Sequence, residues 1–204
     1  LFYHQIFSKI RYIKIFNLYF LSKTMKILKI NQINESEIIS KILQGKIFIY
    51  PTDTIYGLGC NAFNKFSVNK IKRIKERDED KPLSLIAPDF DWIGQNLVLD
   101  CDIHKYLPGP YTLILKKKYP NYLSYVSKTD SLGIRIPDCN FTKIIQKSKA
   151  PFITTSVNLS GEPFATRISD IPDYILERVD YVIDAGELNG NPSTLVIGGK
   201  EIKR

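Results

Sequence analysis

The stretch KIFIYPTDTIYGLG, residues 46–59, joins an apolar strand pattern directly to a loop rich in hydroxyl groups and glycines. Residues 46–50 are predicted to form a strand, and Pro51 ends it because proline has no backbone N–H to donate to a sheet. Loops that follow strands in an open α/β sheet line the crevice where ligands bind, and glycine lets a backbone approach a ligand closely. The stretch therefore predicts a strand followed by one wall of a binding site.

Strand and helix patterns alternate on both sides of this stretch. Asn34 and Glu37 form a capping-box-like start for a helix that Gly45 ends, and apolar residues recur every third position in the amphipathic helix predicted over residues 64–76. Further strands are predicted at residues 26–30, 83–87, 111–115, 133–136, 152–155, 181–184, 194–197 and 201–204, and further helices at residues 141–147 and 169–178 and in the stretch before residue 107. No repeat or linker interrupts this pattern, so we expect one α/β domain with a mixed sheet.

Composition excludes several classes of protein. Hydrophobic residues make up 44% and charged residues 25% of the 204 residues, a balance that excludes disorder, collagen-like repeats and coiled coil. Three widely spaced cysteines and two histidines argue against a zinc site or a disulfide framework and favour a reducing cytosol. The formal charge of +8 favours partners that carry phosphate.

The first 24 residues differ from the rest, because they hold four basic side chains and no acidic one. Their apolar runs are too short to span a membrane, and no small-residue cleavage site follows them as it would in a signal peptide. An interfacial helix is the alternative. Since Met25 is the only methionine, we expect residues 1–24 to be upstream sequence read through or a poorly ordered extension, and residues 25–204 to form the domain.

The glycines of the first stretch also satisfy a dinucleotide-binding pattern. Gly57, Gly59 and Ala62 match G-x-G-x-x-A. Six residues separate them from the strand, however, and Pro51 is one of the six, whereas the dinucleotide loop follows its strand directly. The sequence contains no G-x-x-x-x-G-K-[ST] motif, which excludes a P-loop. We therefore expect a ligand other than a dinucleotide.

A run of basic residues crosses the predicted end of the helix over residues 64–76. It consists of Lys72, Arg73, Lys75, Arg77 and Lys81. Such a run is usually a solvated face, but this one continues into a loop that enters a buried strand, as the rim of a basic pocket would. Lys75 and Arg77 would diverge by about 200° on a continuous helix, so they can face one pocket only if the helix ends between them.

Two further polar clusters lie at strand ends. Arg135 interrupts the apolar strand of SLGIRIP, residues 131–137, and a buried arginine needs an anionic partner, either an internal carboxylate or a carboxylate of the ligand. In TTSVNLSG, residues 154–161, Ser156 would be a nucleophile only with a base beside it, and neither His4 nor His104 has a motif around it. These clusters predict a polyanion site that works by positioning and charge neutralisation, such as nucleotidyl transfer on ATP, with no protein-bound metal and with Mg²⁺ carried mainly by phosphates and waters.

Read in order, these motifs resemble a known family. YPTDTIYGLG, KER followed by KPLSLIA, LPGPYTLIL, SLGIRIPD, TTSVNLSG and NPSTLVI are closely similar to those of the threonylcarbamoyl-AMP synthases, the YrdC-domain proteins, over residues 46–204. The resemblance implies a single YrdC-like domain in which a twisted mixed sheet and flanking helices surround a basic cavity. It also implies that L-threonine, bicarbonate or CO2, and ATP give L-threonylcarbamoyl-adenylate and pyrophosphate. The product would serve the modification of tRNA together with partner proteins, in the cytoplasm and away from membranes.

The resemblance also implies roles for individual residues at matching positions. Threonine contacts are implied for Thr54, Arg135, Ser156 and Ser193. ATP contacts are implied for Lys75, Arg77, Lys81, Ser131, Asn158, Thr166 and Arg204, and Lys75 and Arg77 are also expected to be catalytic. Three positions depart from the family pattern, namely Asp78, Ile86 and Val157, and Val157 would crowd the pocket if its side chain pointed inward.

Two other functions stay open on the sequence. An RNA-binding module would also use a basic concave surface, although no aromatic strand of the RNP type is present. A carbamoyl-handling domain of the kind embedded in larger hydrogenase-maturation proteins is the second, and we expect the short chain to differ from it. Salt-sensitive RNA binding without threonine-dependent turnover would favour the first, and carbamoyl-adenylate chemistry that does not need threonine would favour the second.

Overall fold

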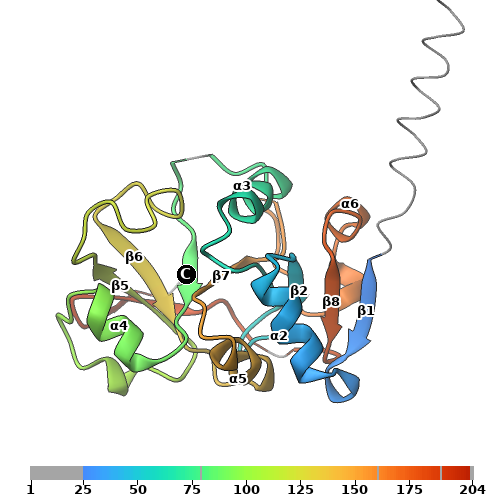
Figure 1. Cartoon of the computed structure of the whole chain (residues 1–204), viewed down its shortest axis with the longest axis horizontal. Helices are drawn as coiled ribbons and strands as arrows, with labels where there is room; N and C mark the ends of the chain where they lie inside the picture. Colours follow the sequence, from blue (N-terminus) through green and yellow to red (C-terminus); the bar gives the residue numbers. More distant parts are fainter. Residues whose placement is uncertain (1–24, 79, 160, 189, 203–204) are drawn as a thin grey trace, which may run out of the picture.

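One mixed sheet organises the computed structural model, which describes residues 25–78, 80–159, 161–188 and 190–202 (Figure 1). The strand order is β1-β8-β2-β3-β7-β4-β6-β5-β9-β10, with both parallel and antiparallel neighbours. The strands are β1 (Lys26–Lys29), β2 (Phe48–Tyr50), β3 (Gly57–Gly59), β4 (Ser84–Ile86), β5 (Tyr111–Lys116), β6 (Ser131–Arg135), β7 (Phe152–Ser156), β8 (Tyr181–Asp184), β9 (Thr194–Ile197) and β10 (Lys200–Ile202). The expectation for residues 1–24 lies outside the described residues.

Five α-helices accompany the sheet in the described part of the chain. They are α2 (Glu35–Leu43), α3 (Lys65–Ile74), α4 (Phe90–Asn96), α5 (Asn140–Lys147) and α6 (Asp173–Leu176), and short 3-10 turns occupy Ile30–Gln32, Ile103–Lys105 and Ile168–Asp170. The predicted cap of the first helix is confirmed, because the Asn34 side chain accepts a hydrogen bond from the Glu37 N–H at 3.1 Å. The predicted α/β fold with a mixed sheet and flanking helices is confirmed. Within the described residues no helix is long and apolar enough to cross a membrane.

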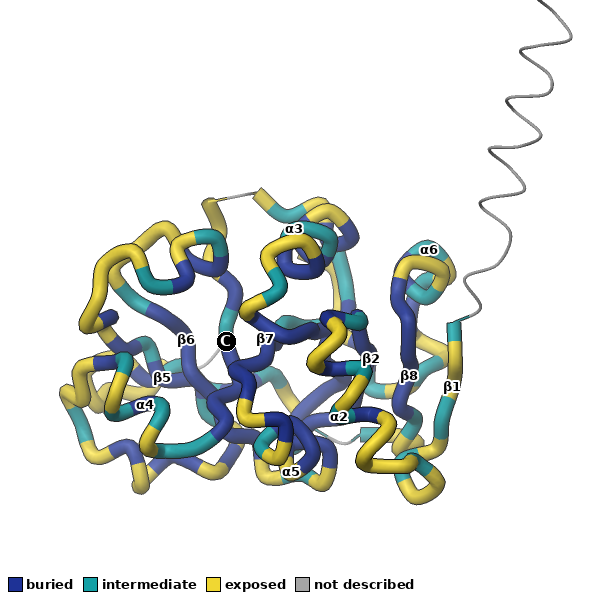
Figure 2. The backbone as a smooth tube through the Cα atoms, in the orientation of Figure 1, coloured by how far each residue is buried: buried dark blue, intermediate teal, exposed yellow. Residues whose placement is uncertain are grey.

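Two apolar cores lie on opposite faces of the sheet, because successive strand residues point to opposite sides. Phe48 and Tyr50 of β2 pack with the apolar faces of α2 and α5, whereas Ile49 between them belongs to the larger core that includes α3 and α4. In Figure 1, α2 and α5 lie side by side in front of the strands, and Figure 2 shows the central strands as the most buried part of the chain.

The strand β3 was not predicted, since Gly57–Gly59 was expected to be loop. It pairs antiparallel with β2 and with β7. A Cβ atom on Gly59 would lie 1.9 Å from the carbonyl oxygen of Ile153, so glycine is needed here for close approach to a neighbouring strand rather than to a ligand. Because these glycines lie in a strand and the next helix begins only at Lys65, the dinucleotide interpretation is excluded.

The helix predicted over residues 169–178 was too long. The chain forms a 3-10 turn at Ile168–Asp170 and then the short helix α6, with Pro172 at its N-terminal cap. A proline restricts the residue before it to extended backbone, and Ile171 has φ −87° and ψ 123°. Pro172 therefore divides the predicted helix between two short elements.

Candidate functional site

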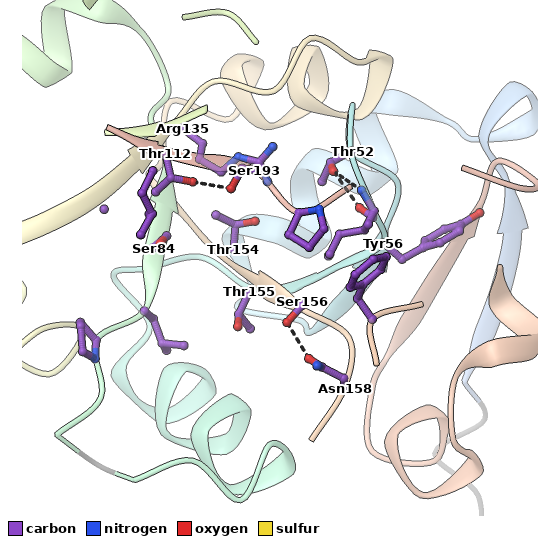
Figure 3. A pocket seen from close by; sticks show the side chains of 18 of the residues that line it. Thr52, Tyr56, Ser84, Thr112, Arg135, Thr154, Thr155, Ser156, Asn158 and Ser193 are labelled. Atoms are coloured by element: carbon purple, nitrogen blue, oxygen red, sulfur yellow. Dashed lines mark hydrogen bonds between the residues drawn. The ribbon is translucent and has the colours of Figure 1, made fainter. Parts of the chain in front are cut away.

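A cavity of about 500 Å³ is lined by residues of β5, β6, β7 and β9 and of the loops beside the strands (Figure 3). This size is typical of small-molecule sites. Its wall includes three cationic side chains and, among the described residues, no Asp or Glu. The lining residues are Thr52, Ile55, Tyr56, Gly57, Arg77, Lys81, Pro82, Leu83, Ser84, Thr112, Ile114, Gly133, Arg135, Thr154, Thr155, Ser156, Asn158, Phe164, Pro192, Ser193 and Leu195.

Arg135 provides the buried charge of this wall. It ends β6, its residue is only 6% exposed, and its Nη2 donates to Asp53 Oδ1 at 2.8 Å. Burial lowers the pKa of the Arg135 guanidinium, and the negative charge of Asp53 acts against that shift. Of the two partners predicted for this arginine, the internal carboxylate is therefore present, and Arg135 also reaches the cavity.

The loop after β2 holds its hydroxyl groups in a fixed order. The Thr52 hydroxyl donates to the Ile55 carbonyl oxygen at 2.7 Å. Since its single proton is used there, the Thr54 hydroxyl must be the donor in the 2.9 Å contact between the two threonines. Thr54 Oγ1 in turn accepts from Arg135 Nη2 at 3.2 Å. Thr54 therefore contacts the guanidinium from behind the wall, while Thr52 is part of the lining.

Ser193 faces the cavity on the Arg135 side (Figure 3). Its hydroxyl lies 2.7 Å from the hydroxyl of Thr112 on β5. The two groups lie 81 positions apart in the chain and meet because β5 runs parallel to β9, which follows Ser193 directly. Thr112 was not singled out from the sequence, although a threonine within an apolar strand was a signal for it.

The opposite end of the cavity is the loop after β7. Ser156 donates to Asn158 Oδ1 at 2.5 Å, and the Asn158 amide donates to the Glu162 carbonyl oxygen at 2.6 Å. An amide oxygen is not a base, so in the part of the chain that the structure describes the Ser156 hydroxyl has no activating partner. His104 packs against Phe90 with ring centroids 4.4 Å apart and ring planes tilted by 34°, and it is not part of the wall. Both observations agree with the expectation that Ser156 is a contact residue.

Lys75 anchors this loop from behind. Its residue is 1% exposed, and its Nζ donates to Ser156 O at 2.6 Å and to Asn158 O and Oδ1 at 2.6 and 3.0 Å. Burial lowers the pKa of Lys75 to about 7, and the charges of Arg77 and Lys81 act in the same direction. In this structure, then, the three N–H donors of Lys75 point to protein oxygens, and Lys75 is not among the lining residues.

The helix α3 ends before Arg77, as the sequence analysis required if Lys75 and Arg77 were to face one pocket. α3 stops at Ile74, and Glu76 takes a left-handed backbone with φ +46°. The helix thus ends before both cations, but only Arg77 lines the cavity, whereas Lys75 bonds to Ser156 and Asn158 from behind the wall. Arg77 also donates through Nε to Lys81 O at 3.2 Å and through Nη2 to Pro82 O at 2.6 Å, which shapes the loop that carries Lys81.

The structure brings most of the expected residues to one place. Arg77, Lys81, Arg135, Ser156, Asn158 and Ser193 line the cavity, and Thr54 and Lys75 bond to lining residues. Ser131 begins β6 beside Thr129, and Thr166 donates to Asp170 at 3.4 Å, both outside the lining. Arg204 lies outside the described residues. Thr52, Tyr56, Thr154 and Thr155 also line the cavity, within the clusters that the sequence predicted for its wall but without individual roles. The sequence analysis did not single out the lining residues Ser84, Thr112 and Phe164.

Two of the three unusual positions face away from the cavity. Val157 is 1% exposed and packs in the larger core, and Ile86 packs in the core of α2 and α5. Neither is a lining residue, so Val157 does not crowd the site. Asp78 is exposed, and its side chain accepts from the Asp80 N–H at 3.0 Å.

Comparison with known proteins identifies one family and relatives with the same name. The family model Sua5_yciO_yrdC, described as "Telomere recombination", matches residues 40–203. A protein of Methanocaldococcus jannaschii named "Putative threonylcarbamoyl-AMP synthase" is 42% identical, over 84% of this chain and 86% of its own length. The "Threonylcarbamoyl-AMP synthase" of Pyrococcus abyssi is 29% identical over 76% of this chain, which spans 48% of that protein.

A solved structure shows the same similarity in three dimensions. The crystal structure of P. abyssi Sua5 complexed with L-threonine matches with a TM-score of 0.70 at 28% identity. The match covers 85% of this chain and 54% of that one. The fold and its order of elements are thus shared over most of the described residues.

Proposed function

The chain belongs to the Sua5/YciO/YrdC family, and on this basis we propose that it is an L-threonylcarbamoyladenylate synthase. In the proposed reaction L-threonine, bicarbonate or CO2, and ATP give L-threonylcarbamoyl-AMP, pyrophosphate and, from bicarbonate, water. The names of the relatives support an enzyme of this kind, and the threonine complex of P. abyssi Sua5 supports L-threonine as the substrate.

The observation that carries the proposal is the division of the cavity into two ends. In Figure 3, Arg135, Thr112 and Ser193 lie at one end, Ser156 and Asn158 lie at the other, and Thr154 and Thr155 lie between them. A buried guanidinium beside hydroxyl groups suits an amino-acid carboxylate and a side-chain hydroxyl. We therefore assign the threonine to the Arg135 end, with Ser193 as a further contact. Threonine contacts from Thr54, which lies behind the wall, and from Ser156, at the other end, stay predictions from the family resemblance.

The nucleotide belongs to the other end. Arg77 and Lys81 reach the wall there on the loop beyond Lys75, and their positive charges suit a triphosphate. Asn158 offers an amide on the same side. Contacts from Ser131, Thr166 and Arg204 stay predictions from the family resemblance.

The chemistry needs no covalent intermediate on the protein. The threonine amine attacks the carbon of bicarbonate or CO2, and the resulting carbamate oxygen attacks the α-phosphorus of ATP while the bond to pyrophosphate breaks. The contribution of the protein is to hold both substrates in line and to neutralise the phosphate charge. The wall is consistent with this role, because it offers cations and hydroxyls, and the Ser156 hydroxyl donates to an amide oxygen rather than to a base.

Magnesium would reach the site bound to ATP. We propose that Mg²⁺ is carried by the ATP phosphates and by waters, since the described lining residues supply hydroxyl and cationic groups rather than carboxylates. We further propose that the product passes to partner proteins for tRNA modification in the cytoplasm. An RNA-binding module without catalysis is the competing proposal, and only the net charge of +8 favours it.

The test is pyrophosphate release by the full chain with ATP, Mg²⁺ and bicarbonate, in the presence and absence of L-threonine. The proposal predicts release only with threonine. Release without threonine would favour carbamoyl-adenylate chemistry of another kind. No release from folded protein, together with salt-sensitive binding of tRNA, would favour the RNA-binding module.

A further inference from the structure

Asp53 is a buried acid to which neither the sequence nor the reaction assigns a role. It lies between Thr52 and Thr54 in the loop after β2, and its side chain is 10% exposed. Its Oδ1 accepts from Arg135 Nη2 at 2.8 Å, and its Oδ2 accepts from the Asp138 N–H at 3.1 Å. Asp53 is not a lining residue, so it reaches the cavity only through Arg135.

The two hydrogen bonds fix Asp53 between two strand ends. One oxygen holds the side chain that ends β6, and the other holds the backbone three residues farther along. The carboxylate therefore ties the loop after β2 to the loop after β6. A group held at both oxygens has little freedom to turn, and neither has the guanidinium that is bonded to it.

The orientation of Arg135 follows from which of its donors are used. A guanidinium has five N–H groups, and both of those on Nη2 are used, by Asp53 Oδ1 and by Thr54 Oγ1. The buried Nε has no acceptor among the described residues, and Arg135 lines the cavity. Because Nε is buried, the donors of Nη1 are the ones available to an anion that enters the cavity.

The charge of Asp53 also supports a role in holding Arg135. A guanidinium as buried as Arg135 needs a counter-charge to stay in place when the cavity holds no anion. Asp53 supplies that charge without using the remaining donors. The arginine is thus kept charged and oriented before a ligand arrives.

We propose that Asp53 is a positioning residue for the substrate carboxylate, which it serves by holding Arg135 through Nη2 with the Nη1 donors left for the ligand. The inference rests on the proposed function for the identity of the substrate, L-threonine. A purely structural ion pair is the alternative, and the two differ in what they predict for ligands with and without a carboxylate.

The experiment compares L-threonine with L-threoninol, which lacks the carboxylate, and uses the full chain, its Asp53→Asn variant and a control. Asp53→Asn keeps the size of the side chain and an acceptor oxygen but removes the charge. The control is Glu35→Gln, which removes an exposed ion pair with Lys147 between α2 and α5. Dissociation constants for the two ligands and for ATP are measured by calorimetry.

Asp53→Asn is expected to weaken threonine binding about tenfold or more, while the affinities for threoninol and ATP change less than about twofold. Glu35→Gln should leave all three affinities unchanged. An unchanged affinity for threonine, or an equal loss for threonine, threoninol and ATP, would overturn the role of Asp53.

If Asp53→Asn does not fold, the Asp53→Glu variant tests the positioning role instead. It keeps the charge but moves the guanidinium, so threonine binding should still weaken relative to ATP, and an unchanged threonine affinity would contradict the proposal. Failure of the unaltered chain to bind threonine is a separate outcome. It would overturn the proposed function, and this inference with it.

Discussion

The ammonium of Lys75 lies 2.6 Å from the carbonyl oxygen of Ser156, which ties the end of α3 to the loop that follows β7. The neighbouring cation of the same motif, Arg77, lines the cavity instead. The two cations thus have different partners although they are only two positions apart: Lys75 bonds to the protein and Arg77 faces the cavity. The left-handed backbone of Glu76 lies between them. We interpret Lys75 as the residue that shapes the site and Arg77 as the one that contacts the nucleotide.

Lys75→Met tests this division. The substitution leaves three protein oxygens without their donor, so the loop with Ser156 and Asn158 should shift. Since small displacements in a site cost large factors in rate, we expect kcat/KM to fall at least about tenfold for threonine and for ATP alike. Lys147→Met, which changes an exposed lysine on α5, is the control. A loss confined to ATP, with the threonine kinetics unchanged, would instead make Lys75 a direct phosphate ligand.

The lowered pKa of Lys75 predicts how stability depends on pH. Folding lowers this pKa from its ordinary value of 10.5 to about 7, so between these values the unfolded chain binds the proton more strongly. Through this group the free energy of unfolding should therefore rise with pH from about 7 to about 10.5, by at most about 1.4 kcal/mol per pH unit. Urea unfolding of the unaltered chain and of Lys75→Met at several pH values measures the difference. Equal slopes in the two proteins would contradict the prediction.

Arg135→Ala should separate the two ends of the cavity. Removing the guanidinium deletes the charge-assisted hydrogen bonds to the substrate carboxylate, so we expect the KM for threonine to rise about 100-fold while ATP binding stays measurable. Steady-state kinetics with each substrate varied in turn, together with direct ATP binding, provide the measurement. Equal loss for both substrates would show that Arg135 does not act on threonine alone.

Gly59→Ala should disrupt the sheet beside the site. The added Cβ would lie 1.9 Å from the backbone oxygen of Ile153, which cannot move without breaking the β3–β7 contact. We expect a loss of at least about 3 kcal/mol in the free energy of unfolding. Gly94→Ala in α4 is the matched control, because nothing lies within 4 Å of its Cβ position, and it should be neutral or stabilising by up to about 1 kcal/mol. Similar effects of the two substitutions would contradict the packing described for β3.

The sequence predicted most elements because their signals are local. The cap at Asn34 and the apolar periodicity of α3 need no knowledge of the rest of the chain. The strand β3 has only three residues, two of them glycines, and it forms because β2 and β7 pair with it on either side. Such a strand has no periodicity from which to predict it.

The candidate site was predicted in its composition but not in its internal contacts. The polar clusters at the strand ends indicated Arg77, Arg135 and Asn158, which line one cavity. The pairing of Thr112 with Ser193 depends on the parallel contact of β5 with β9, which lies far along the chain. Whether a polar side chain faces a ligand or another residue depends on such contacts, and no local pattern encodes them.

The central claim is that this cavity joins threonine, bicarbonate and ATP into one product. The most direct measurement supplies the full chain with ¹³C-bicarbonate, L-threonine, ATP and Mg²⁺ and analyses the adenylate by mass spectrometry. We predict a threonylcarbamoyl-adenylate that is heavier by one mass unit than the product from unlabelled bicarbonate, and that is absent when threonine is omitted. An adenylate without the label, or pyrophosphate released with no adenylate that contains threonine, would contradict the claim.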